Sequence, residues 1–196
     1  MTAREAEIIE LIRKEVKPAL GCTEPIAVAL AVAKAMEIIE ERCPQHSTDW
    51  RTSEDYILRI EVSGNILKNG MGVGIPGTGM VGLHIAAALG AVCGKSEYGL
   101  EVLHDLDEKS IARAKELVET DAVTVGLAET DHKLYVKASV KNLEGHLASA
   151  VIEDDHDNIV ETSFDKSVLS SSHKPDDNAA CDQKTTLDYK LTVKEI

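Results

Sequence analysis

The sequence predicts an α+β fold in which N-terminal helices pack on a mostly antiparallel sheet. Two observations predict it. The first half of the chain carries apolar residues at helical spacing, and the second half carries short alternating segments separated by polar turns. Of the 196 residues, 43% are hydrophobic but only 3% are aromatic, so the core must be built mainly from Ala, Val, Ile and Leu.

Helices are expected at 3–16, 24–42, 79–93 and 107–119. The first must end before Pro18, because a proline disfavours the helical conformation of its predecessor. Thr23 is the expected N-cap of the second helix, whose uniformly apolar start should be buried. The third helix is rich in alanine, and a glycine-rich loop leads into it. Asp107 should open the fourth.

Strands are expected at 55–63, 122–127, 133–141, 146–153 and 158–163. Polar turns separate the last four and predict an antiparallel meander. The polar stretch 45–53 is interpreted as a loop. We expect residues 1–165 to form an α+β domain, 166–186 to be a polar linker, and 187–196 to begin a truncated C-terminal domain with Thr192 as a helix N-cap.

The net charge of −13 argues against partners that present phosphates, such as nucleic acids or anionic membrane surfaces. No apolar run reaches the roughly 20 residues of a membrane span, and the N-terminus lacks a signal-peptide core. These features predict a cytoplasmic protein. The four cysteines show neither CxxC nor zinc-finger spacing, and disulfides are unlikely in that compartment.

Cys22 is the candidate metal ligand. It precedes the N-terminus of the 24–42 helix, where unpaired N–H groups and the helix dipole stabilise a thiolate, the form that iron or zinc binds. The alternative is a structural cysteine packed beneath the start of the helix, and the local residues alone favour that alternative.

The segment 63–82 is the second candidate site, with six glycines from Gly70 to Gly82. Its N–H groups could form an anion-binding nest at a helix N-terminus, with Thr78 capping that helix and presenting its hydroxyl. The candidate substrate-binding residues are Asn65, Lys68, Asn69, Gly77, Thr78 and Gly79. In the alternative, the glycines serve only a tight loop and close helix packing. The GxGxxG match at 77–82 lacks the context of a dinucleotide site.

The histidines give a weaker signal. His156 and Asn158 lie in an Asp-rich turn between two predicted strands, and such a sequence is more typical of a turn than of a metal site. The other histidines within the predicted domain show no metal spacing; they are His46, His84, His104, His132 and His146. Ser170–His173 falls in the predicted linker and is discounted as a hydrolase signature.

Three segments resemble the N-terminal half of the L-cysteine desulfidase / L-serine dehydratase alpha-chain-like family: 15–27, 65–73 and 75–83. His156–Val160 is similar to that family's His-x-Asn-Ile-Val segment. The resemblance implies a lyase independent of pyridoxal phosphate, which holds a 4Fe–4S cluster on three cysteines and cleaves L-cysteine to pyruvate, ammonia and sulfide. Cys22 matches one ligand position. Cys43, Cys93 and Cys181 do not match the other two, which lie in a helical C-terminal half.

This resemblance sets the functional expectations. The chain alone should be inactive and carry no cluster, and it should pair with a missing C-terminal domain or form a homo-oligomer. The small-molecule partner would be an amino acid. The alternatives are an L-serine dehydratase-type ammonia-lyase, a non-catalytic amino-acid-binding domain, and a scaffold that pairs through the alanine-rich helices. No residue is assigned as the general base.

Overall fold

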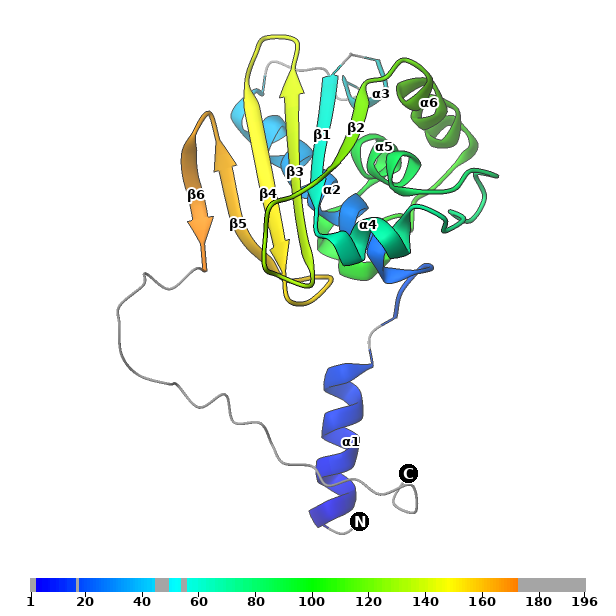
Figure 1. Cartoon of the computed structure of the whole chain (residues 1–196), viewed down its shortest axis with the longest axis vertical. Coiled ribbons are helices and arrows are strands. Elements are labelled where there is room, and N and C mark those ends of the chain that lie inside the picture. The colour runs from blue at the N-terminus through cyan, green and yellow to red at the C-terminus, as the bar shows by residue number, and fades with distance from the viewer. Residues whose placement is uncertain (1–2, 17, 45–49, 54–55, 173–196) are drawn as a thin grey trace.

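The structure is a computed structural model that describes residues 3–16, 18–44, 50–53 and 56–172. A sheet of six strands carries helices on one face (Figure 1). The helices are α1 (Ala3–Glu15), α2 (Thr23–Arg42), α3 (Trp50–Ser53), α4 (Gly64–Gly70), α5 (Leu83–Cys93), the 3-10 helix η1 (Ser96–Glu101) and α6 (Glu108–Glu119). The strands are β1 (Tyr56–Val62), β2 (Val123–Leu127), β3 (Tyr135–Asn142), β4 (Leu147–Glu153), β5 (Ile159–Phe164) and β6 (Ser167–Ser171).

The sheet order is β2-β1-β3-β4-β5-β6. In this sheet β1 and β2 pair in parallel, and the other neighbouring strands pair antiparallel. The predicted antiparallel meander is confirmed for β3, β4 and β5, and β6 extends it. It was wrong for β2, because β1 lies between β2 and β3. In β1, Tyr56, Leu58, Ile60 and Val62 are buried while Ile57 is 57% exposed, which is the period-two pattern of a strand with one covered face. The α+β prediction is therefore confirmed.

Helix α2 is the centre of the core. It contacts β3 and β4 on one side and α5 on another, so its apolar start is enclosed all round, as predicted. Gly90 permits the close approach of α5, because an added Cβ there would lie 2.4 Å from the carbonyl oxygen of Ala29. Small residues at this crossing thus allow close helix packing in a core that has few aromatic side chains.

Two predicted helix starts were wrong. Helix α2 begins at Thr23, so Cys22 is its N-cap, although the Cys22 side chain makes no capping hydrogen bond. Helix α5 begins at Leu83 rather than at residue 79, and its N-cap is Gly82 with φ of 99°. Thr78 therefore does not cap it. Asp107, in contrast, does cap α6 by accepting a hydrogen bond from the Ser110 N–H.

Four short elements fall where no regular structure was expected. One is the 3-10 helix η1, which lies between two predicted helices. Trp50–Ser53, predicted as loop, is a helical turn whose Trp50 is buried. Gly64–Gly70 forms α4 within the glycine-rich segment. Ser167–Ser171 forms β6 inside the predicted linker and is exposed throughout. It pairs with β5 by main-chain hydrogen bonds, which require no apolar pattern in the sequence. The remaining residues of the predicted linker from 173 onwards, and the predicted segment 187–196, lie outside the described residues.

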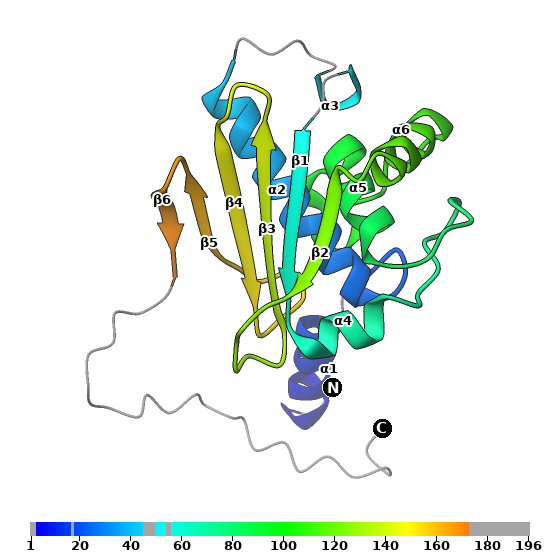
Figure 2. The ribbon, with the colours of Figure 1, turned by 45° about the horizontal axis from the view of Figure 1, so that its top comes forward.

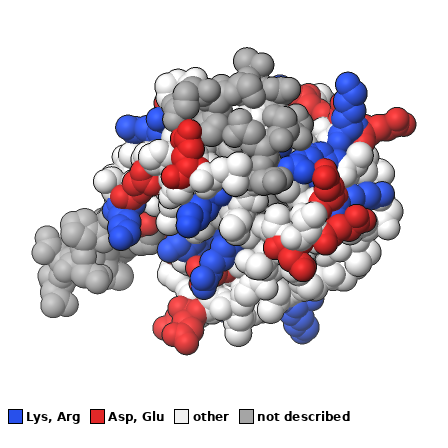
Figure 3. Space-filling view, turned by 90° about the horizontal axis from the view of Figure 1, so that it is seen from above, with Lys and Arg blue, Asp and Glu red and all other residues white. Residues whose placement is uncertain are grey.

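Helix α1 stands clear of the sheet in both views (Figures 1 and 2), and its Ile9 and Ile12 are exposed. Among the described residues, no helix combines the length and hydropathy that a membrane crossing requires. Seen from above, acidic and basic side chains are interspersed over the surface (Figure 3), so the negative net charge is not gathered on that face.

Candidate functional site

Cys22 lies exposed at the start of α2, and its thiol is engaged by a carboxylate. The Sγ atom donates a hydrogen bond to Glu24 Oε2 at 2.8 Å. The other oxygen, Oε1, accepts one from Asn69 Nδ2 of α4 at 3.3 Å. Two hydrogen bonds thus connect the thiol, the carboxylate and the amide, and they join α2 to α4.

The protonation state of Cys22 differs from the thiolate that the sequence predicts. The Glu24 hydrogen bond raises the pKa of Cys22, burial adds to the increase, and the backbone N–H groups at the start of α2 oppose it less strongly. The Cys22 hydrogen bond in turn lowers the pKa of Glu24, with smaller contributions from Asn69 and from the charge of His156. The carboxylate two residues away therefore outweighs the helix N-terminus, and Cys22 is a protonated donor.

A hollow of about 200 Å³ opens beside Glu24. It is lined by Glu24, Asn65, Ile66, Asn69, Lys133, Leu134 and His156. Its volume corresponds to roughly six or seven water molecules at about 30 Å³ each. The hollow brings together a carboxylate, two amides, an ammonium group and an imidazole, and it has room for a small polar molecule.

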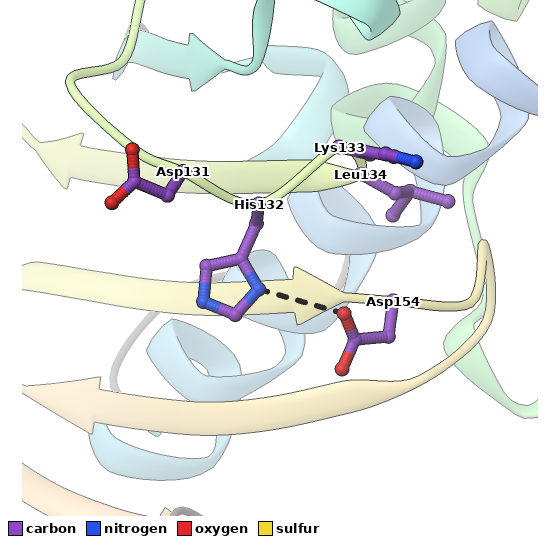
Figure 4. Close-up of a pocket in the computed structure, with 5 residues that line it drawn as sticks. All are labelled: Asp131, His132, Lys133, Leu134 and Asp154. Atoms are coloured by element: carbon purple, nitrogen blue, oxygen red, sulfur yellow. Dashed lines mark hydrogen bonds and ion pairs between the residues drawn. The ribbon is translucent and has the colours of Figure 1, made fainter.

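A second hollow of about 400 Å³ shares Lys133 and Leu134 with the first. Figure 4 shows His132 and Asp154 directed toward each other there, and His132 Nδ1 lies 3.5 Å from Asp154 Oδ1. Asp131, His132 and Asp154 are all exposed. The smaller hollow is the better candidate site because it adjoins the Cys22–Glu24 pair, and because two of its polar residues, Glu24 and His156, are only partly exposed.

The glycine-rich loop lies next to Cys22, but mostly satisfies its own polar groups. An added Cβ on Gly21 would be 3.9 Å from the Pro76 ring. Two of the segments that carry the family resemblance, 15–27 and 75–83, are therefore neighbours. Thr78 is buried; its hydroxyl donates to the Ile75 carbonyl at 2.8 Å and accepts from the Met80 N–H at 2.9 Å. The Thr78 hydroxyl thus fixes the turn instead of facing a ligand, contrary to prediction.

The other predicted residues divide between the two interpretations. Asn65 and Asn69 line the hollow, whereas Lys68 is exposed and does not. Gly77 has φ of 79°, and an added Cβ would meet Ile111 and Leu106 at 3.7 Å, so this glycine serves loop geometry and packing. Gly79, with φ of 70°, faces open space. The main-chain N–H groups of Val73, Ile75, Thr78 and Gly82 donate within the segment, which reduces the predicted anion nest.

The remaining described cysteines are distant from Cys22 or turned inward. Cys43 caps the opposite end of α2, about 30 Å away at 1.5 Å per residue. Cys93 is half-buried at the end of α5, and burial raises its pKa to about 11. Cys181 lies outside the described residues. The described part of the chain therefore offers one thiol at the hollow, which does not suffice to hold a cluster that needs three.

Sequence reasoning missed Glu24, Lys133 and His156 as members of the site. Glu24 and His156 do lie in the segments that carry the family resemblance, which was a usable signal. Lys133 gave none, because its role depends on where the β2–β3 connection passes.

Several curated proteins similar to this chain share one name. A UPF0597 protein of Phocaeicola vulgatus is 47% identical over 164 residues, which cover 83% of this chain and 35% of that protein. One from Dichelobacter nodosus is 40% identical over 194 residues, covering 98% and 41% respectively. The chain is a homologue of the UPF0597 proteins. One from Parabacteroides distasonis is 43% identical over 169 residues, covering 86% and 36%.

The UPF0597 name belongs to an uncharacterised family and indicates no activity. The chain spans about two fifths or less of the length of these relatives. No family model matches the chain. No solved structure matches it either.

Proposed function

We propose that the chain is the N-terminal part of an iron–sulfur-dependent β-eliminating lyase that needs no pyridoxal phosphate and converts L-cysteine to pyruvate, ammonia and sulfide in the cytoplasm. The observation that carries this proposal is the exposed Cys22 thiol at the start of α2, beside a hollow lined with complementary polar groups. It adds to the resemblance in sequence.

The polar groups of the hollow complement an amino-acid zwitterion. In the proposal, Lys133 and the amides of Asn65 and Asn69 bind the α-carboxylate, because an ammonium group and amide N–H groups are donors. Glu24, whose pKa is lowered, stays ionised and pairs with the α-ammonium group. His156 is the proposed proton acceptor, since it lies in the same hollow and a neutral imidazole has a ring nitrogen that can accept a proton.

The cluster is proposed only for a longer protein. Among the described cysteines Cys22 alone adjoins the hollow, so the 196-residue chain should bind no 4Fe–4S cluster and release no sulfide. The relatives are more than twice as long as the matched segment, and the additional sequence of such a protein is the proposed source of the other ligands.

A hybrid protein tests the proposal. In the Dichelobacter nodosus relative, the segment that matches this chain would be replaced by this chain, and the hybrid and the unmodified relative would be purified without oxygen. Both should release sulfide and pyruvate from L-cysteine. The proposed reaction is wrong if the unmodified relative is inactive on both amino acids. It would then release no sulfide or pyruvate from L-cysteine, and no pyruvate or ammonia from L-serine.

L-Serine is the second candidate substrate, because the hollow complements the zwitterion common to both amino acids. A non-catalytic amino-acid-binding domain is the third candidate, and it requires only the described residues. Calorimetry of the 196-residue chain with L-cysteine and L-serine separates these cases. The binding-domain candidate would be favoured by two results together. The chain would bind one of the amino acids, more weakly as Lys133→Ala, and the relative would be inactive.

A further inference from the structure

Three potential metal ligands meet at the far end of α2 from Cys22. They are Cys43, which caps α2, and Glu144 and His146 from the hairpin between β3 and β4. One ligand atom from each lies within 4.8 Å of those from the other two. In Figure 2 the end of α2 lies beside this hairpin near the top of the view. About 100 residues of sequence separate the two segments, so neither spacing nor motif signals the cluster.

The separations are close to those of a tetrahedral site. Zinc bonds of about 2.0 Å to nitrogen or oxygen and 2.3 Å to sulfur place ligand atoms about 3.5 Å apart. His146 Nε2 is 3.9 Å from Glu144 Oε2. Small side-chain rotations of the two half-exposed hairpin residues would therefore bring the ligands to bonding distance.

A second carboxylate orients the histidine. Asp165 Oδ2 lies 2.7 Å from His146 Nδ1, and Asp165 Oδ1 accepts the Leu147 N–H at 2.9 Å. The Phe164 ring stacks on the imidazole with centroids 5.4 Å apart. Because the ionised Asp165 accepts a hydrogen bond from Nδ1–H, Nε2 keeps its lone pair free for a metal. This carboxylate–histidine arrangement is the one that metal-binding histidines usually have.

The charges also favour a cation. Glu144 and Asp165 place negative charge near the Cys43 thiol. A divalent ion would balance the two carboxylates and stabilise the thiolate form. Cys43 itself is 1% exposed, whereas Glu144 and His146 are partly exposed, so one side of the cluster is open to water.

We propose that Cys43, Glu144 and His146 bind a zinc ion, with Asp165 positioning His146 and a water molecule as fourth ligand. Zinc prefers four sulfur, nitrogen or oxygen ligands in tetrahedral geometry. The ion would tie the end of α2 to the β3–β4 hairpin. This site is independent of the proposed lyase function, since α2 alone separates it from Cys22 by about 30 Å.

Cobalt titration of the metal-free 196-residue chain tests the site. Thiolate ligation gives Co²⁺ a near-ultraviolet charge-transfer band, and displacement by Zn²⁺ should remove it. The wild-type chain should bind one ion with this band. Cys43→Ser should abolish the band, and His146→Gln should weaken binding at least tenfold. Asp165→Asn should weaken it about 10–100-fold, as loss of an orienting partner does.

Cys93→Ser and His132→Gln are the matched controls. Cys93 is a thiol away from the cluster, and His132 is a half-exposed histidine that also has carboxylate neighbours. Both should bind cobalt as the wild type does. A band that survives Cys43→Ser, a band that Cys22→Ser alone removes, or no band at all would overturn the proposal. His146 and Asp165 are partly exposed, so their variants decide the question even if Cys43→Ser fails to fold.

Discussion

Gly90→Ala tests the central packing of the fold. In α5 an added Cβ at residue 90 would lie 2.4 Å from the Ala29 carbonyl oxygen and 2.8 Å from the Ala29 Cα atom. Both are main-chain atoms of α2, which cannot rotate away as a side chain would. The two helices would have to separate, and both are anchored on the sheet.

The magnitude follows from two opposing effects. Alanine is favoured over glycine within a helix by about 0.8–1 kcal/mol. Overpacking costs typically about 1–3 kcal/mol and more where the backbone must move, and here the obstacle is backbone. We expect a net loss of about 2 kcal/mol or more. For a chain of this size that loss lowers the melting temperature by about 4–8 °C.

The assay is thermal unfolding followed by circular dichroism. Gly126→Ala in β2 is the matched control, because an added Cβ there meets nothing within 4 Å, and it should unfold near the wild-type temperature. If Gly90→Ala is as stable as the control, the close crossing of α2 and α5 is wrong.

Three further predictions concern charge and metal. Glu24→Gln should lower the pKa of Cys22 and speed its alkylation at neutral pH, measured by peptide mass spectrometry; unchanged or slower alkylation would contradict the hydrogen bond to Glu24. Asp107→Ala should lower the melting temperature at pH 7, and this deficit should shrink as pH falls below the ordinary Asp pKa of 3.8. The reason is that hydrogen bonds from Ser110 lower the pKa of Asp107, so its stabilising effect exists above that value and is lost below it. A deficit that persists unchanged in acid would contradict the cap. Zinc at 100 times its dissociation constant should stabilise the chain by about 2.7 kcal/mol, or roughly 5–11 °C, and His146→Gln should remove the effect.

The sequence was sufficient for elements that carry a strong apolar pattern. Helix α2 and strand β1 were predicted within a residue or two, because burial imposes a helical or alternating spacing on their side chains. It was insufficient for β6, whose exposed residues need no such pattern, and for α4, whose seven residues include two glycines and two asparagines.

The site shows the same division. Cys22 was found from its position before a helix, but its charge depends on Glu24, whose carboxylate was assigned only to the first turn of that helix. Lys133 and the Cys43–Glu144–His146 cluster depend on which loops the sheet brings together. Such contacts join residues far apart in the chain, and local patterns carry no information about them.

Iron content is the most direct test of the proposal that Cys22 is a cluster ligand. The hybrid of this chain with the Dichelobacter nodosus relative would be reconstituted without oxygen as Cys22→Ser and as Cys93→Ser. The account predicts that Cys93→Ser keeps the iron, the sulfide and the cluster absorption of the parent hybrid, and that Cys22→Ser loses most of all three. Equal iron and equal absorption in the two variants would contradict it.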